Sequence, residues 1–153
     1  MALFLSTYIN KIDKKGRVSV PASFRAALVG ESFQGIITFR SYKHPAIEGC
    51  GIGRMQRLSD NADSLDFFSD GQDDTASTIF ADSQQLVFDS EGRVFLPQPL
   101  IEHAKLTDQV AFVGRGATFQ IWNPEIFERM QAESRDRVRN AQASAKKSQG
   151  EHE

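Results

Sequence analysis

The sequence predicts a mainly β protein with short helices, an α+β fold built from two copies of a ββαββ unit. Three observations predict it: one phrase occurs twice in the chain, apolar and polar residues alternate in its first occurrence, and a proline ends the apolar run in both. A unit of about 45 residues leaves much of its apolar surface uncovered. We therefore expect the two units to pair around one shared core, as a pseudo-twofold β-barrel or sandwich.

The repeated phrase is IDKKGRVSVP (Ile12–Pro21), which returns 76 residues later as FDSEGRVFLP (Phe88–Pro97). Five of the nine positions that follow Ile12 are identical in the two copies. Further along, the apolar stretch GIITF at Gly35–Phe39 lies opposite AFVGR at Ala111–Arg115. Two diverged copies of one unit explain this agreement.

Each copy begins with a predicted hairpin. The first strands are expected over Tyr8–Ile12 and Gln85–Phe88, and the returning strands over Arg17–Val20 and Arg93–Leu96. Between them lies Asp-x-x-Gly, which favours a tight turn. Aspartate accepts hydrogen bonds from the local backbone, and glycine adopts a positive φ without strain.

A helix and a second strand pair complete each copy. Proline cannot donate to a strand ladder, so it ends the returning strand and starts a helical turn. Short helices are expected over Ala22–Leu28 and Pro99–Ala104. The strand pair that follows is clearest over Val110–Trp122, which has a glycine-rich turn in its middle.

Helices are also expected outside the two copies. The linker is predicted to form two helical pieces over Met55–Ala81, broken near Gly71, with apolar residues at roughly helical spacing: Met55, Leu58, Leu65 and Phe68. Asn123-Pro124-Glu125 is a helix-start signal, and its helix has Phe127, Met130 and Val138 on one face. From about Gln142 the chain is polar and is expected to fray. The expected division is 7–54 and 83–126 for the two related domains, 55–82 for an acidic helical linker, and 127–153 for the terminal helix and tail.

Composition excludes several classes of protein. The chain has 153 residues, of which 40% are hydrophobic and 25% charged, as in ordinary globular proteins. The longest apolar run, MALFL, is too short to span a membrane and lacks the features of a signal peptide. The single cysteine, Cys50, rules out an intrachain disulfide. We expect a cytoplasmic protein without a membrane partner.

The net charge of -2 conceals two blocks of opposite charge. Residues 1–57 hold nine Lys/Arg and three Asp/Glu, whereas residues 58–91 hold nine acidic residues and no basic ones. A local positive patch attracts polyanions even on a mildly acidic protein. Composition alone also fits the simpler interpretation that these charges only solvate the surface.

Paired D-x-x-x-R motifs, Asp13…Arg17 and Asp89…Arg93, inside duplicated GR-V-x-V/L-P units resemble the MraZ family. The resemblance covers Leu3 to about Arg137 and includes FVGRGATFQIW before the terminal helix. It implies a double swapped-hairpin barrel, with each half similar to an AbrB/SpoVT domain, and assembly into a ring. It further implies a nucleoid-associated transcriptional regulator, a repressor of the division and cell-wall gene cluster and its own gene. Such a regulator binds short direct repeats in double-stranded DNA.

The sequence departs from the family pattern at two places. The last strand of the first unit falls in HPAIEGCGIG (His44–Gly53) and is expected to be short or irregular. The linker contains SDGQDD (Ser69–Asp74) where the family is often basic. The acidic linker argues against a DNA contact from that segment, but it does not affect the hairpin.

The two hairpins share the residues that build the turn and differ at the two positions between its aspartate and its glycine. Asp13, Gly16, Asp89, Gly92 and Arg93 are assigned to architecture, because both turns need them. The two positions between the aspartate and the glycine hold Lys14-Lys15 in the first copy and Ser90-Glu91 in the second. The five-residue turns therefore carry charges of +2 and -1. We expect the DNA-binding residues to be Lys14, Lys15 and Arg17, with support from Arg25, Arg40 and Lys43.

An enzyme is not expected, and neither is a cofactor. The three histidines have no metal-type spacing to one another or to Cys50, and no base is placed to activate the cysteine. The main alternative is an antitoxin-type protein-binding module, docking a partner through the acidic linker and the terminal helix. A purely structural oligomer is the third possibility.

Overall fold

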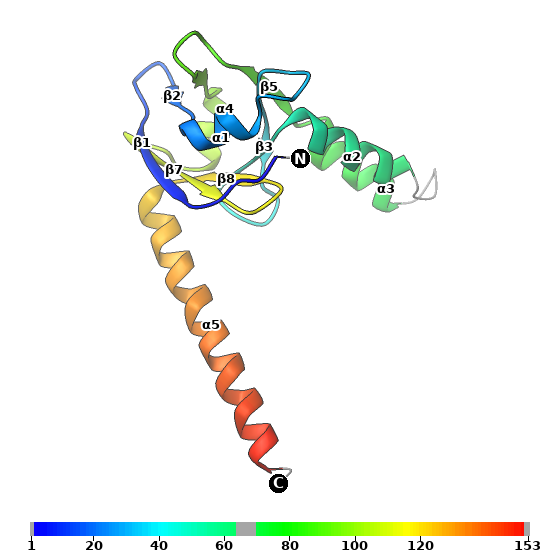
Figure 1. Cartoon of the computed structure of the whole chain (residues 1–153), viewed down its shortest axis with the longest axis vertical. Coiled ribbons are helices and arrows are strands. Elements are labelled where there is room, and N and C mark those ends of the chain that lie inside the picture. The colour runs from blue at the N-terminus through cyan, green and yellow to red at the C-terminus, as the bar shows by residue number, and fades with distance from the viewer. Residues whose placement is uncertain (1, 64–69, 152–153) are drawn as a thin grey trace. The chain divides into compact units, whose positions relative to one another are not determined.

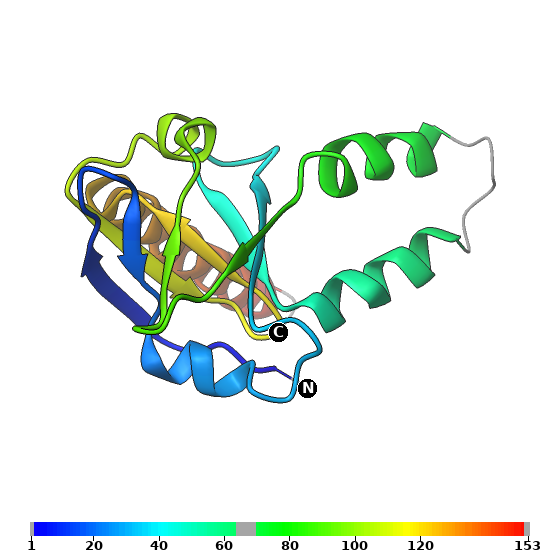
Figure 2. The same ribbon diagram turned by 90° about the horizontal axis from the view of Figure 1, so that it is seen from above.

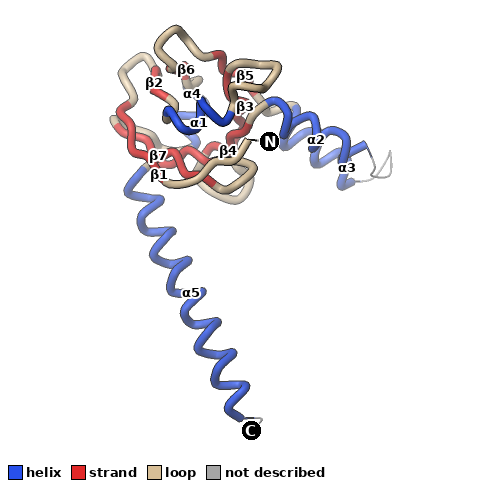
Figure 3. Tube along the Cα trace, viewed as in Figure 1, coloured by secondary structure: helices blue, strands red, loops and turns tan. Residues whose placement is uncertain are grey.

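The computed structural model describes residues 2–63 and 70–151. Within these residues, antiparallel strands and short helices make up the body of the chain, which confirms the predicted α+β class (Figures 1 and 3). The chain divides into two compact units, Met1–Asn123 and Pro124–Glu153. Both sequence repeats therefore belong to one unit, together with the linker between them.

The first repeat forms the elements that its sequence predicts, and each lies within a few residues of its expected place. They are β1 (Thr7–Lys11), β2 (Arg17–Ser19), α1 (Ala22–Ala27), β3 (Gly35–Arg40) and β4 (Ile47–Cys50). β4 is short, as expected, but it is not irregular. It pairs in register with β3 on one side and with β8 of the second repeat on the other.

The second repeat forms the same series. Its elements are β5 (Gln84–Val87), β6 (Arg93–Phe95), α4 (Gln98–His103), β7 (Gln109–Gly114) and β8 (Phe119–Trp122). The glycine-rich turn between β7 and β8 contains Gly116, whose φ is 83°. A positive φ is a conformation that glycine adopts at little cost.

The two repeats exchange their hairpins. β1 of the first repeat pairs with β7 of the second, and β5 of the second pairs with β3 of the first. β2 and β6 pair with each other as a two-stranded ribbon, separate from the six-stranded sheet β1-β7-β8-β4-β3-β5. Figure 2 shows strands from both repeats interleaved around one interior. Every pairing of one repeat thus has its counterpart in the other.

The strand register corrects one detail of the sequence comparison. β3 pairs β5 from Gly35↔Val87, and β7 pairs β1 from Gln109↔Lys11, so Gly35 corresponds to Gln109 rather than to Ala111. The cause is the segment between helix and strand. It is two residues shorter after α4, which ends at His103, than after α1, which ends at Ala27.

One apolar core joins the repeats. At its centre four phenylalanines are linked by ring contacts with centroids 5.0 to 6.3 Å apart: Phe4, Phe24, Phe112 and Phe119. Val18 of β2 and Val94 of β6 close the core beneath the ribbon, each only 1% exposed. Val18 and Val94 lie directly opposite each other and so share the buried face. Because successive side chains on a strand point to opposite faces, the neighbouring ribbon residues face solvent.

The linker is helical on both sides of the undescribed segment. α2 (Ile52–Asp63) is followed by α3 (Asp70–Thr75) and a π-helical turn, η1 (Ala76–Phe80). Gly71 lies inside α3 and does not break it, and Leu65, Phe68 and Ser69 lie outside the described residues. Met55 joins Ile37, Phe39 and Cys50 in a second, smaller apolar cluster, which anchors α2 to the sheet.

The second unit is a single helix, α5 (Pro124–Glu151). It begins at the predicted proline and continues beyond Gln142, where the polar composition favours fraying. The segment holds no further proline and no glycine before Gly150. Alanine, glutamine, lysine and arginine, which are strong helix formers, fill most of its last turns.

Candidate nucleic-acid interface

The carboxylate of Asp13 organises the first hairpin turn. Its Oδ1 accepts hydrogen bonds from the backbone N–H groups of Lys15 and Arg17, each at 2.9 Å. Gly16 follows with φ 89°, and its N–H donates to the Asp13 carbonyl at 3.0 Å. The side chain thus holds a backbone turn that the sequence alone predicts.

The same carboxylate binds the arginine side chain. Arg17 Nε donates to Asp13 Oδ2 at 2.6 Å, and the Arg17 side chain remains 32% exposed. The backbone N–H of Arg17, more than any other group, lowers the pKa of Asp13 below its ordinary value. Asp13 is therefore ionised at neutral pH and aligns the arginine without covering it.

Lys14 and Lys15 occupy the tip of this turn. Both are exposed. Within residues 2–63 and 70–151, neither side chain forms an ion pair or a hydrogen bond. Two ammonium groups and one guanidinium thus face solvent on a turn that Asp13 holds in place.

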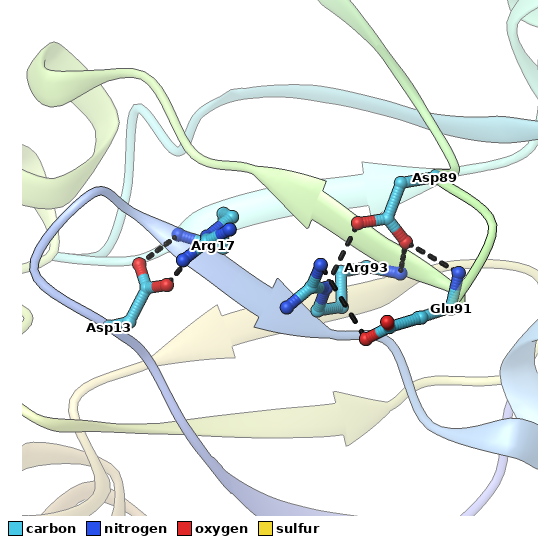
Figure 4. A network of polar contacts seen from close by, with 5 residues as sticks. All are labelled: Asp13, Arg17, Asp89, Glu91 and Arg93. Atoms are coloured by element: carbon cyan, nitrogen blue, oxygen red, sulfur yellow. Dashed lines mark hydrogen bonds and ion pairs between the residues drawn. The ribbon is translucent and has the colours of Figure 1, made fainter.

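The second hairpin repeats the turn with a different charge. Asp89 Oδ1 accepts from the backbone N–H groups of Glu91 and Arg93 at 2.8 and 2.9 Å, and Gly92 has φ 77°. Arg93 Nε donates to Asp89 Oδ2 at 2.9 Å. In addition, the Glu91 carboxylate lies 3.5 Å from Arg93 Nη2, so this arginine is paired with two acids (Figure 4).

The β2–β6 ribbon places both arginines on one exposed face. Arg17 is the cross-strand partner of Phe95, and Ser19 is the partner of Arg93. Val18 and Val94 point the other way into the core. The four outward residues form a patch that we call the ribbon face: Arg17, Ser19, Arg93 and Phe95.

Arg25 does not join the first turn. Its Nε donates to the carbonyl oxygen of Val20 at 3.1 Å, and its guanidinium covers Gly92 of the second turn. Ile101 of α4 covers Gly16 in the corresponding way. The two turns lie at opposite ends of the ribbon, about 13 Å apart by the rise of a strand. Arg25 thus adds a positive charge beside the second turn, not the first.

Arg40 and Lys43 also lie away from the first turn. Arg40 ends β3, which β4, β8 and β7 separate from β1 in the sheet, and its guanidinium is held by Asp82 at 2.7 Å. Lys43 is exposed in the loop between β3 and β4. Of the six residues expected to bind DNA, the structure brings together Lys14, Lys15 and Arg17.

Two features of this surface were missed from the sequence. The ion pair of Glu91 with Arg93 was not expected, although the two residues lie only two positions apart. The phenylalanines were expected in the core, which is wrong for Phe95, because it is 56% exposed. The matching residue of the first copy is Ser19, a polar residue between two valines, and this already indicates that the Phe95 ring points outward.

The remaining chemistry is poor in catalytic features. Burial raises the pKa of the Cys50 thiol to about 12, so the nucleophilic thiolate is scarce at neutral pH. Among the described residues, no three His, Cys, Asp or Glu side chains could together hold a metal ion. None of the helices within the described residues has the length and apolar character to span a membrane.

The pH dependence of stability tests the Asp13 turn. The pKa of Asp13 is lowered by folding, so its carboxylate stabilises the folded chain at neutral pH, and this contribution is lost as pH falls below about 4. Asp13→Asn is therefore expected to lower the melting temperature at pH 7, and this deficit should be smaller at pH 3. Asp60→Asn, at an exposed position on α2, is the control for charge alone. An Asp13→Asn deficit that is equal at both pH values contradicts this role.

The strand exchange and paired turns together define a class of protein, a duplicated chain with swapped hairpins. The family model described as "MraZ protein, putative antitoxin-like" matches residues 3–44 and 79–149. Similar proteins include one from Pelagibacter ubique (strain HTCC1062), 46% identical over 94% of this chain and 93% of its own length. Another, from Rickettsia bellii (strain OSU 85-389), is 50% identical over 84% of this chain and 86% of its own. Both are named transcriptional regulator MraZ. The chain belongs to the MraZ family, as its motifs predicted, and the relatives' name agrees with the expectation that it is not an enzyme.

Proposed function

We propose that this chain is a sequence-specific DNA-binding transcriptional regulator, and that its first hairpin holds the DNA. The observation that carries the proposal is the contrast between two turns of the same architecture. Both hold an arginine through an aspartate, but of the two turns only the first adds exposed cations that form no ion pair within residues 2–63 and 70–151. The name of its relatives, transcriptional regulator MraZ, supports the same class of function.

The two kinds of cation have different tasks in this proposal. Lys14 and Lys15 neutralise phosphates, which provides affinity for any sequence and makes it depend strongly on salt. Arg17 can donate two hydrogen bonds to guanine O6 and N7, which discriminates between bases by about 1–3 kcal/mol. Its alignment by Asp13 reduces the conformational freedom lost on binding. A two-stranded ribbon is narrow enough to enter the major groove.

One hairpin makes few contacts, so a single subunit binds weakly. We infer that the chain assembles into a ring that presents several identical hairpins to short direct repeats in DNA. Linked binding of this kind raises affinity by about 10²–10⁴ when the spacing of the sites matches. In a bacterial cell this protein acts in the cytoplasm on the nucleoid. It represses the division and cell-wall gene cluster, including its own gene.

Binding to the DNA upstream of its own gene tests the proposal. A labelled duplex of that region is titrated with the full chain in a gel-shift assay, beside a duplex of shuffled sequence. Light scattering after size exclusion measures the mass of the protein alone and with DNA. Preference for the upstream duplex and a multi-subunit complex are expected. Assembly with no DNA affinity at modest salt means that the chain is only a structural oligomer.

A second candidate is an antitoxin-type protein-binding module. The family description favours it with the words "antitoxin-like", and the exposed acidic residues of α3, Asp73 and Asp74, offer a charged docking surface. A pull-down from lysate, repeated with both aspartates replaced by asparagine, tests it. Capture of one partner that depends on these aspartates, without any DNA shift, would replace the DNA-binding proposal.

A further inference from the structure

We propose that Phe95 contacts a thymine that lies one or two base pairs from the base that Arg17 contacts. The inference rests on the proposed function and goes beyond it, because it assigns base specificity to the second repeat. In this account the two repeats do not divide into a binding half and an inert half. The first contributes the cations and the second contributes an apolar contact on the same ribbon face.

The position of Phe95 is the first observation. Its neighbours Val94 and Leu96 are 1% and 3% exposed, whereas Phe95 is 56% exposed. It lies directly opposite Arg17 in the β2–β6 pairing. Side chains at such positions have Cβ atoms about 4.5–5.5 Å apart. The ring and the guanidinium therefore belong to one small patch of surface.

The fold does not require a phenylalanine here. The position that corresponds to Phe95 in the first repeat is Ser19, which occupies the same place opposite Arg93. The repeats share the aspartate, glycine, arginine, valine and proline that build the ribbon, so a serine satisfies the same framework. An aromatic ring at this site is therefore available for a contact outside the chain.

The surrounding charge indicates which partner the ring meets. Lys14, Lys15 and Arg17 give the near end of the ribbon a charge of +2 after Asp13 is counted, and no acidic side chain is paired with the lysines among the described residues. A cationic ribbon suits a polyanion. On base edges in the major groove, the thymine C5-methyl is the apolar group that a phenylalanine can contact.

The spacing sets the expected sequence preference. Base pairs follow one another at about 3.4 Å along the axis. Two side chains whose Cβ atoms lie about 5 Å apart therefore contact bases one or two base pairs from each other. We expect every bound repeat to contain a thymine within two base pairs of the guanine that Arg17 contacts.

Replacing thymine by uracil tests the contact, because it removes the methyl group and leaves the base pairing intact. The probe is the shortest duplex that the full chain selects from a random pool, with each thymine replaced in turn. Wild-type protein is expected to lose about threefold to tenfold in affinity at one thymine per repeat. Phe95→Ser should bind more weakly and be insensitive to that replacement. Ser19→Ala, at the matching position, should respond as the wild type does.

Each outcome has a distinct meaning. Equal binding of thymine and uracil duplexes by the wild type overturns the inference without requiring any variant to fold. If Phe95→Ser instead changes the mass of the assembly and not the thymine dependence, the Phe95 side chain lies in an interface between subunits and the inference is wrong. Phe95→Leu serves as the folded variant if Phe95→Ser melts early. If the wild type selects no DNA at all, the proposed function itself has failed.

Discussion

Replacing Lys14 and Lys15 with alanine is expected to weaken binding to every DNA sequence and to reduce its dependence on salt. Each phosphate contact contributes about 0.9 to the slope of log affinity against log salt, so the slope should fall by about 1.8 for each hairpin engaged. Because several hairpins act together in the proposed ring, the loss of affinity should reach at least about a hundredfold. Fluorescence anisotropy at a series of salt concentrations measures both quantities.

The chain offers a matched control for this experiment. Lys146 and Lys147 are also adjacent and exposed, but they lie on α5. Alanine at both positions removes the same charge without changing any residue of a hairpin. If this control loses as much affinity and slope as Lys14→Ala/Lys15→Ala, net charge rather than the hairpin tip explains binding.

Arg17→Ala is expected to relax base preference more than it lowers overall affinity. The difference in binding free energy between a duplex with the preferred guanine and one with another base at that position should shrink by about 1–3 kcal/mol. This is the discrimination that a bidentate arginine contact provides. Arg17→Lys keeps the charge but loses the planar pair of donors, so it should retain affinity for shuffled DNA and lose discrimination. Competition binding with duplexes that differ at single base pairs provides the measurement.

Arg93→Ala distinguishes a loss of base preference from a loss of stability. Arg93 forms the same bond to Asp89 that Arg17 forms to Asp13, and it forms a further ion pair with Glu91. The melting temperature of Arg93→Ala should therefore fall at least as far as that of Arg17→Ala, whereas only Arg17→Ala should change base preference. Loss of preference in Arg93→Ala, with Arg17→Ala unaffected, contradicts the assignment.

Local features of the fold were predictable from the sequence because they depend on neighbouring residues. The Asp-x-x-Gly turns bring together groups within four positions, and alternation in Arg17–Ser19 identifies the buried Val18. The length of α5 was underestimated for a related reason. Polarity suggested fraying, but the helix propensity of the same residues favours continuation.

Contacts between distant segments were not predictable in the same way. Arg25 covers the turn of the other repeat, because exchange of the hairpins places α1 above Gly92. Arg40 is engaged by Asp82, which is 42 positions away. A strand's own pattern shows which side is buried, but it does not name the strand beside it. For these reasons the sequence predicted six basic residues for one DNA-binding surface, of which Lys14, Lys15 and Arg17 lie together.

Photo-crosslinking compares the two hairpin tips most directly. A benzoylphenylalanine is placed at position 14 in one protein and at the matching position 90 in another, and each is irradiated with the selected duplex. We predict DNA adducts from position 14 and few or none from position 90. Adducts from position 90, with none from position 14, would show that the acidic turn faces the DNA and would contradict the assignment of binding to the first hairpin.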